Sequence, residues 1–206
     1  MSFYSIADFI KKYYPEYFGI QTYPIAECAA IRKVKDEWGL LSNFAPTPLV
    51  VDGVTFESSE ELFQLMKFKD ADIISHIRAG ITMGGKTCRQ IKMTAKSYEK
   101  AYRRPDWGQM ILDAMKFCLT VKYEQCSEFR DLLQKSVCKY IVEDQTSMSK
   151  KDPDAWGVKT DGNNYVGPNL LGRRLMELRD NDTLNYHRPN DALTFITAIK
   201  GIDRHF

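Results

Sequence analysis

The spacing of apolar residues predicts a chain that is mainly helical. Ser2 or Ser5 can cap a first helix, and Pro15 ends it, because proline has no amide hydrogen to donate. Ser58 with Ser59 can cap a second, since acidic residues follow in its first turn. Apolar positions with the 3.6-residue period of a helix recur over residues 3–14, 58–68, 70–77, 105–119, 129–133, 167–179 and 190–199.

A small β component is expected beside these helices. Residues 28–35 and 139–143 are short β-rich runs, and Asp-Gly inside residues 49–56 predicts a hairpin turn. Residues 144–155 are polar and irregular, as in a functional loop. The predicted class is therefore α+β, mainly α. At this length, with no linker composition, residues 1–206 are expected to form one domain.

The amino-acid composition argues against several classes of protein but does not indicate a particular reaction. Lys and Arg number 29 against 27 Asp and Glu, so the net charge of +2 argues against a sequence-blind nucleic-acid binder. No apolar run is long enough to span a membrane, and the charged N-terminal stretch does not resemble a secretory signal. Five cysteines without a CxxC pair predict free thiols in the cytoplasm. The three histidines lack metal-ligand spacing, so no metal or other cofactor is expected.

One motif suggests nucleotide binding. The stretch from Gly80 to Thr87 fits GxxxxGK[ST], the loop that cradles phosphates with backbone N–H groups. Such a loop must connect a buried strand to a helix, and the segment before Gly80 has helical spacing instead. An interhelical turn is the alternative that this spacing favours.

A second candidate site lies on the predicted helix 58–68. Glu60, Gln64 and Lys67 stand at positions i, i+4 and i+7, which places them on one stripe of the helix. A carboxylate and an amine joined by an amide can act as acid/base and nucleophile on one ligand. Spacing alone favours the alternative, a solvated face with a weak ion pair.

A third candidate site lies in the C-terminal half. Asp152 and Asp154 flank Pro153 just before Trp156 and Gly157, which offers a carboxylate beside an aromatic wall. Asn169 stands where a helix is predicted to begin, and N–H groups there can receive a phosphate. The alternative is that Trp156 belongs to the core and Asn169 only caps the helix.

Taken together, these pieces resemble the NADAR (YbiA-like) family. Five matching segments follow one another in the family's order between residues 39 and 179. They are Gly39-Leu-Leu-Ser42-Asn43-Phe44, Ser59-Glu60 with Gln64-x-x-Lys67, Asp106-Trp107 with Met115-Lys116-Phe117, Ile141-Val142-Glu143 with Trp156-Gly157, and Gly167-x-Asn169-x-x-Gly172-x-x-Leu175-Met176-x-x-Arg179. Residues 1–38 and 180–206 then count as N- and C-terminal extensions.

The chain departs from the family pattern at two positions. The family aspartate three residues before Trp-Gly is replaced by Pro153, which leaves Asp152 and Asp154 as alternatives for its role. Glu61 stands where many members have histidine.

The resemblance implies a YbiA-like N-glycosidase that hydrolyses a ribosyl C–N bond without a cofactor. Its substrates would be guanine bases of nucleic acid that carry ADP-ribose, or phosphoribosylamino-pyrimidine intermediates of riboflavin synthesis. The resemblance leaves open whether an ADP-ribosyltransferase toxin is encoded beside the chain. A phosphate-loop protein and a non-catalytic ADP-ribose-binding module remain the alternative functions.

The same resemblance assigns roles to individual residues. Lys67 and Glu60 would form the catalytic pair, and Asp154 or Asp152 would orient a ribose hydroxyl or stabilise positive charge. The expected substrate-binding residues are Asn43, Phe44, Gln64, Trp107, Trp156, Gly157 and Asn169.

Overall fold

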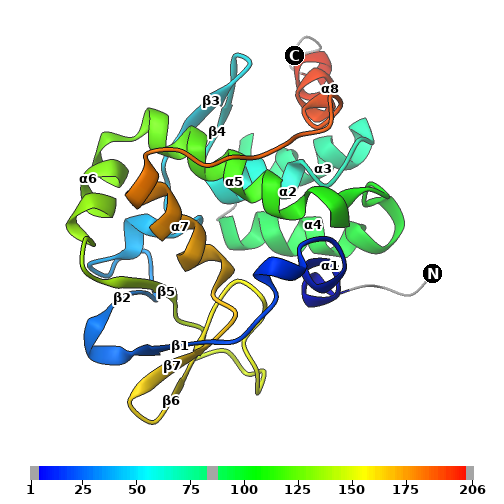
Figure 1. Cartoon of the computed structure of the whole chain (residues 1–206). Helices are drawn as coiled ribbons and strands as arrows, with labels where there is room; N and C mark the ends of the chain where they lie inside the picture. Colours follow the sequence, from blue (N-terminus) through cyan, green and yellow to red (C-terminus); the bar gives the residue numbers. More distant parts are fainter. Residues whose placement is uncertain (1–4, 83–87, 203–206) are drawn as a thin grey trace. The chain divides into compact units, whose positions relative to one another are not determined.

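Helices dominate the structure, as the apolar periodicity predicts. The computed structural model describes residues 5–82 and 88–202 (Figure 1). Within these ranges the α-helices are α1 (Ile6–Tyr13), α2 (Ser59–Leu65), α3 (Ala71–Thr82), α4 (Cys88–Tyr102), α5 (Trp107–Gln125), α6 (Ser127–Lys135), α7 (Leu170–Asn181) and α8 (Thr194–Ile202). The strands form three small sheets, so the mainly α, α+β class is confirmed. The described residues fall into two compact units.

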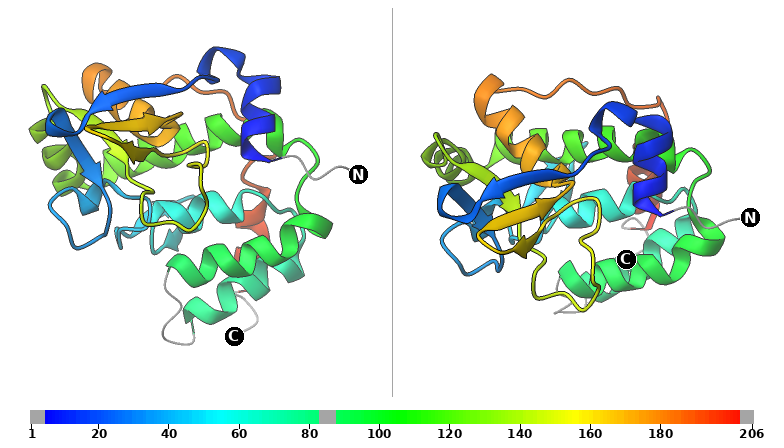
Figure 2. Two further views of the ribbon diagram at one scale, coloured as in Figure 1. Left: turned by 90° about the horizontal axis from the view of Figure 1, so that it is seen from below. Right: turned by 60° about the horizontal axis from the view of Figure 1, so that its bottom comes forward.

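The first unit contains residues 5–45 and 126–185 and carries two of the sheets. Figures 1 and 2 show the first sheet as three neighbouring strands in the order β1, β7, β6, all antiparallel. Strand β2 pairs with β5 in parallel to make the second. The bounds of these strands are β1 (Gln21–Pro24), β2 (Cys28–Ile31), β5 (Tyr140–Glu143), β6 (Lys159–Asp161) and β7 (Asn164–Gly167).

Helix α7 packs closely against β5 in the first unit. A Cβ added to Gly172 of α7 would lie 2.0 Å from the Ile141 carbonyl oxygen, which only glycine permits. A buried cluster of Tyr23, Val142, Val158 and Tyr165 lies where the two sheets meet. The close approach of Gly172 to Ile141 fixes the first turn of α7 against β5.

The second unit contains residues 46–82, 88–125 and 186–202. Strands β3 (Leu49–Val51) and β4 (Val54–Phe56) form the predicted hairpin, with Asp52 and Gly53 at φ of 49° and 76°. Helix α2 packs against α4 and α5, and α3 packs against α8. The C-terminal segment completes this core, because Phe195 of α8 is fully buried and its ring lies 5.9 Å from that of Phe56.

Several elements differ from the sequence-based prediction. Helix α4 was not predicted, because its sequence is mostly polar and only Ile91 and Ala95 of its 15 residues are buried. The three- and four-residue strands β1, β6 and β7 are too short for a periodic signal. The predicted helices 167–179 and 190–199 begin later, at Leu170 and Thr194.

The phosphate-loop interpretation lacks the strand that it requires. Helix α3 runs from Ala71 to Thr82, so the motif's first three residues continue a helix. Residues 83–87, which hold the rest of the motif, lie outside the described residues. The alternative of a turn after a helix agrees with the part that is described.

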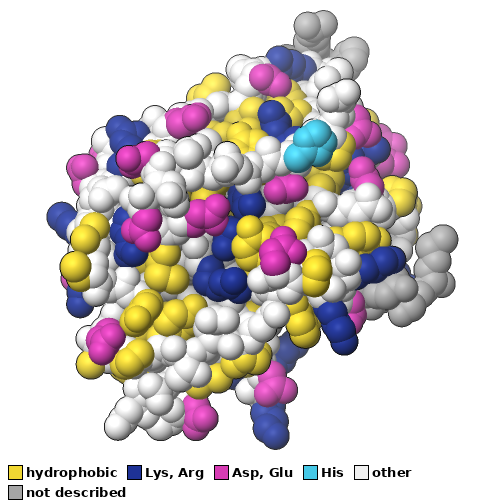
Figure 3. Space-filling view, viewed as in Figure 1, with side chains coloured by type: hydrophobic (Ala, Val, Ile, Leu, Met, Phe, Trp, Pro, Cys, Tyr) yellow, Lys and Arg dark blue, Asp and Glu magenta, His cyan; other side chains and the backbone are white. Residues whose placement is uncertain are grey.

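Two further predictions concern the surface and the thiols. Among residues 5–82 and 88–202, no helix combines the length and apolarity that crossing a membrane requires. Figure 3 shows basic and acidic side chains interspersed on the face in view, in keeping with the nearly balanced charge. All five cysteines are free thiols, as predicted.

Candidate active site

Helix α2 and the turn after it hold the predicted polar stripe in the interior of the second unit, since the helix ends at Leu65 and Lys67 lies two residues beyond it. The Ser58 hydroxyl caps the helix by accepting a hydrogen bond from the Glu61 amide at 3.2 Å. Every residue from Ser59 to Leu65 is buried, and Glu60, Gln64 and Lys67 are 3%, 1% and 8% exposed. The solvated-face alternative is therefore wrong, since packing against α4 and α5 covers the polar side of α2 as well as its apolar side.

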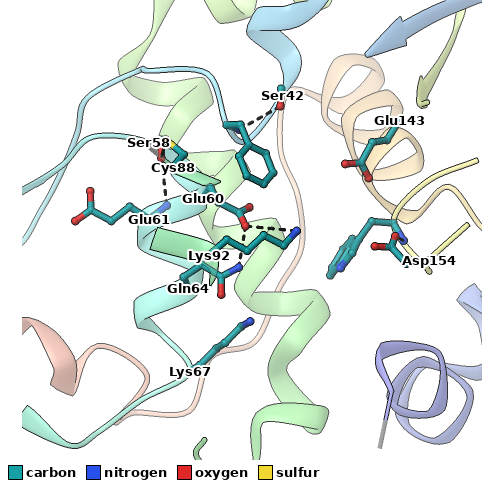
Figure 4. A network of polar contacts seen from close by, with 12 residues as sticks. Ser42, Ser58, Glu60, Glu61, Gln64, Lys67, Cys88, Lys92, Glu143 and Asp154 are labelled. Atoms are coloured by element: carbon teal, nitrogen blue, oxygen red, sulfur yellow. Dashed lines mark hydrogen bonds and ion pairs between the residues drawn. The ribbon is translucent and has the colours of Figure 1, made fainter. Parts of the chain in front are cut away.

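Glu60 and Gln64 form the first part of this stripe (Figure 4). The Gln64 amide donates to Glu60 Oε1 at 2.8 Å, and the Lys92 ammonium of α4 lies 3.8 Å from the same oxygen. Gln64 Oε1 is buried and accepts no hydrogen bond from the described residues. A buried acceptor without a donor is costly, so this end of the stripe can take a hydrogen bond from an incoming group.

Lys67 pairs with a residue of α4. Its Nζ lies 2.5 Å from Glu99 Oε1, and the other Glu99 oxygen lies 3.7 Å from the Arg103 guanidinium. Burial lowers the pKa of Lys67, while Glu99 and, more weakly, Glu60 raise it. The structure thus bonds Lys67 to Glu99 rather than to Glu60, its predicted catalytic partner.

Aromatic rings line the apolar side of the lysine. Lys67 Nζ lies 5.7 Å from the Phe63 ring centre and 5.9 Å from that of Trp107. These two rings pack edge to face at 5.2 Å, and Trp107 is 2% exposed. Trp107 therefore supports the lysine in this structure, and its stacking on a substrate base stays a prediction.

A second polar cluster lies in the first unit and includes the predicted Asp154 (Figure 4). The buried Gln145 donates through Nε2 to Asp154 Oδ1 at 2.7 Å and to Glu143 Oε2 at 3.2 Å, and it accepts from the Asp154 amide. Asp154 Oδ1 also accepts from the Trp156 amide at 2.9 Å. Asp152 is exposed. Of the two aspartates, Asp154 is the one fixed by the fold.

The residues around this cluster are mainly buried. Trp156 is 7% exposed, and a Cβ on Gly157 would lie 2.6 Å from the Glu143 carbonyl oxygen. Asn169 occupies the N-cap position of α7 with φ of 52°, but its side chain caps nothing. It bonds the backbone of β5 instead, with Nδ2 donating to Ile141 and Oδ1 accepting from Glu143. Phosphate binding by Asn169 stays a prediction.

The predicted substrate-binding residues Asn43 and Phe44 also belong to the first unit. Asn43 is 4% exposed, and Phe44 is half-buried in a turn that its amide closes by donating to Ser42 Oγ at 3.1 Å. The short helix Gly39–Leu41 comes immediately before this turn and packs against α6.

The structure adds four polar residues that the site prediction left out. Lys92 and Glu99 lie on α4, the helix that apolar spacing did not reveal. Gln145 and Glu143 lie at the end of β5, with Gln145 facing both carboxylates. No short-range signal marks Glu99, since it stands 32 residues after Lys67 in the chain.

Known proteins match the part of the chain that contains these residues. A model of the NADAR domain matches residues 31–181. A protein named N-glycosidase YbiA from Shigella boydii serotype 4 (strain Sb227) is 35% identical over 146 residues, which are 70% of this chain and 82% of that protein. The N-glycosidase YbiA of Escherichia coli (strain K12) is 34% identical over the same shares.

Two further matches extend this comparison. A riboflavin biosynthesis protein of Vibrio vulnificus (strain YJ016) is 28% identical over 79% of this chain and 40% of that protein. The NMR structure of the E. coli protein YbiA superposes with a TM-score of 0.57 and 29% identity, over 79% of this chain and 90% of that one. The region matched by the domain model runs from the end of β2 to the end of α7 and includes every site residue described above.

Proposed function

This chain belongs to the NADAR domain family, and from that membership and its buried lysine we propose that it is an N-glycosidase that hydrolyses a ribosyl C–N bond. The names of its YbiA relatives support the reaction class. The observation that carries the proposal is the Lys67 amine, buried beside two aromatic rings and bonded to Glu99.

A lysine in this setting suits nucleophilic catalysis. A ribosylamine opens at its C1′–O4′ bond to an imine, which a neutral amine can attack at C1′. The bond from Lys67 Nζ to C1′ forms and the bond from C1′ to the base nitrogen breaks. The two protons of the attacking amine pass to the leaving nitrogen, which leaves an imine between Lys67 and C1′. Burial favours the neutral amine because it lowers the pKa of Lys67. Glu60 exchanges protons with the reacting groups and activates the water that releases the sugar.

Two substrate classes fit this reaction. One is guanine in nucleic acid that carries ADP-ribose, and the other is a phosphoribosylamino-pyrimidine. The name of the Vibrio vulnificus relative supports the second class. Both contain a base and a ribose, so the unpartnered Gln64 Oε1 can accept from a ribose hydroxyl in either. We assign Asp154 to a ribose hydroxyl on the sequence pattern alone.

Replacement of Lys67 tests the proposal directly. Lys67→Ala is expected to release no base from ADP-ribosylated guanine DNA or from the phosphoribosylamino-pyrimidine, because the nucleophile is gone. Base release is followed by chromatography, and circular dichroism checks that the variant is folded. Lys96→Ala, an exposed lysine of α4, is the control and should retain activity.

Chemical trapping separates covalent from direct hydrolysis. Borohydride reduces an imine between Lys67 and C1′ to a stable secondary amine, which peptide mass spectrometry locates. Cleavage without an adduct would leave direct hydrolysis with Glu60 as general base. A fully active Lys67→Ala protein would contradict the site assignment. ADP-ribose binding that survives loss of both Glu60 and Lys67, without turnover, would indicate a non-catalytic module.

A further inference from the structure

We propose that Glu99 is the proton partner of Lys67, a positioning residue that holds the ammonium in place and takes one proton from it when the amine acts as nucleophile. The proposal rests on the glycosidase function above. It adds a residue that neither the sequence motifs nor the names of the relatives assign.

The geometry distinguishes Glu99 from the other carboxylate near the lysine. Glu99 Oε1 lies 2.5 Å from Lys67 Nζ, within hydrogen-bond reach. Glu60 Oε1 instead accepts from Gln64 at 2.8 Å and faces Lys92 at 3.8 Å. A proton can therefore pass from Lys67 to Glu99 along an existing hydrogen bond without movement of either side chain.

The charged groups around the amine come from two helices. Glu60 of α2 and Glu99 of α4 favour the ammonium, whereas Lys92 of α4 opposes it. Arg103, one turn after Glu99, lies 3.7 Å from Glu99 Oε2. Helix α5 contributes the Trp107 ring.

This arrangement explains how a lysine held in an ion pair can still become a nucleophile. Transfer of one proton from Nζ to Glu99 Oε1 converts the pair to an amine and a carboxylic acid, with no change in its net charge. Arg103 then remains beside the neutral acid and favours return of the proton. The amine lone pair forms the bond to C1′, and the proton on Glu99 is available for the later release of Lys67.

The test measures the protonation of Lys67 without a substrate. The rate at which a small acylating reagent modifies Lys67 is followed by peptide mass spectrometry across pH, in the wild type and in Glu99→Gln. Removal of the carboxylate takes away the group that most favours the ammonium and leaves only Glu60 to oppose burial, so the apparent pKa of Lys67 should fall by about one to three units. Glu124→Gln, an exposed glutamate at the end of α5, is the matched control and should leave it unchanged.

A second variant covers the case in which Glu99→Gln does not fold. Glu99→Asp keeps the charge but shortens its reach by one methylene, so the pKa of Lys67 should fall by less than in Glu99→Gln. A residue that only stabilised the fold would change the thermal midpoint without moving this pKa. An unchanged Lys67 pKa in the folded variants would overturn the inference.

Activity separates the inference from the function on which it rests. In Glu99→Gln the amine can lose its proton only to solvent, so the acid limb of the pH–rate profile for base release should follow the labelling pKa of Lys67. In the wild type the proton passes within the pair, so the acid limb should not follow that pKa. If the labelling pKa falls but neither substrate is cleaved, the pairing stands and the glycosidase function fails. If base is released but neither the labelling pKa nor the acid limb moves, the function stands and the role of Glu99 fails.

Discussion

A single buried amide side chain organises the polar cluster of the first unit. Gln145 is 2% exposed and serves two carboxylates at once, with one amide group donating to Asp154 and to Glu143. Two acidic side chains that approach the same point repel each other unless donors lie between them. The amide therefore fixes Asp154 beside Trp156 at the end of the irregular loop.

Gln145→Ala should lower the free energy of unfolding by about 1–3 kcal/mol, because it removes a buried amide that donates to two carboxylates and accepts from the Asp154 amide. Urea denaturation followed by circular dichroism measures this change. Lys135→Ala, at an exposed position at the end of α6, is the control and should stay within about 0.5 kcal/mol of the wild type. Equal stability of both variants would contradict the role given to Gln145.

Contacts between pairs of helices, and between a helix and a strand, determine where the polar residues lie. Helix α4 brings Glu99 and Lys92 to α2, and α7 brings Asn169 to β5. Each contact requires that two backbones or side chains approach closely, as where a Cβ on Gly172 would lie 2.0 Å from the Ile141 carbonyl oxygen.

Gly172→Ala should destabilise the protein by about 1–3 kcal/mol or prevent folding, because the added Cβ would overlap the Ile141 carbonyl and force α7 away from β5. Gly201→Ala in α8 is the matched control, since nothing lies within 4 Å of its added Cβ. Alanine there is expected to be neutral or to stabilise the helix by up to about 1 kcal/mol. Thermal unfolding of both variants compares the two positions.

Over the whole molecule, contacts distant in sequence hold the C-terminal segment in the second unit. Asp191 bonds Lys69 at 2.5 Å and the buried Arg104 guanidinium at 2.7 Å. These partners lower the pKa of Asp191 from 3.8 to about 2. The contribution of this carboxylate to stability is therefore present above pH 3.8 and is lost as the pH falls towards about 2.

Asp191→Asn should accordingly lower the thermal midpoint at pH 7, and the difference from the wild type should shrink below about pH 4 and vanish near pH 2. Thermal unfolding across this range measures it. Asp131→Asn, at an exposed position of α6, is the control. A difference that persisted unchanged at pH 2 would show that the loss comes from packing rather than from charge.

The sequence alone determined the elements with strong local signals. Apolar periodicity predicted α1, α2, α3 and α5, and Asp52-Gly53 predicted the hairpin, because helix period and turn chemistry act over a few residues. Helical spacing placed Glu60, Gln64 and Lys67 on one stripe, although α2 ends at Leu65 and Lys67 lies two residues beyond it. Residues before 39 and after 179 counted as extensions, yet β1 and β2 pair within the first unit's sheets and Phe195 lies in the core of the second.

Only the tertiary structure decided that the stripe is buried and which residues complete it. Spacing on a helix gives the direction of a side chain but not what covers it. Helix α4, which packs against α2, has a mostly polar sequence and was not predicted. Glu99 bonds Lys67, which lies 32 residues earlier in the chain, and Gln145 bonds Asp154 on the other side of the loop. A local sequence pattern does not predict contacts between residues so far apart in the chain. The sequence determined the chemical groups, and packing determined their partners, because burial and charge depend on what the rest of the chain places beside them.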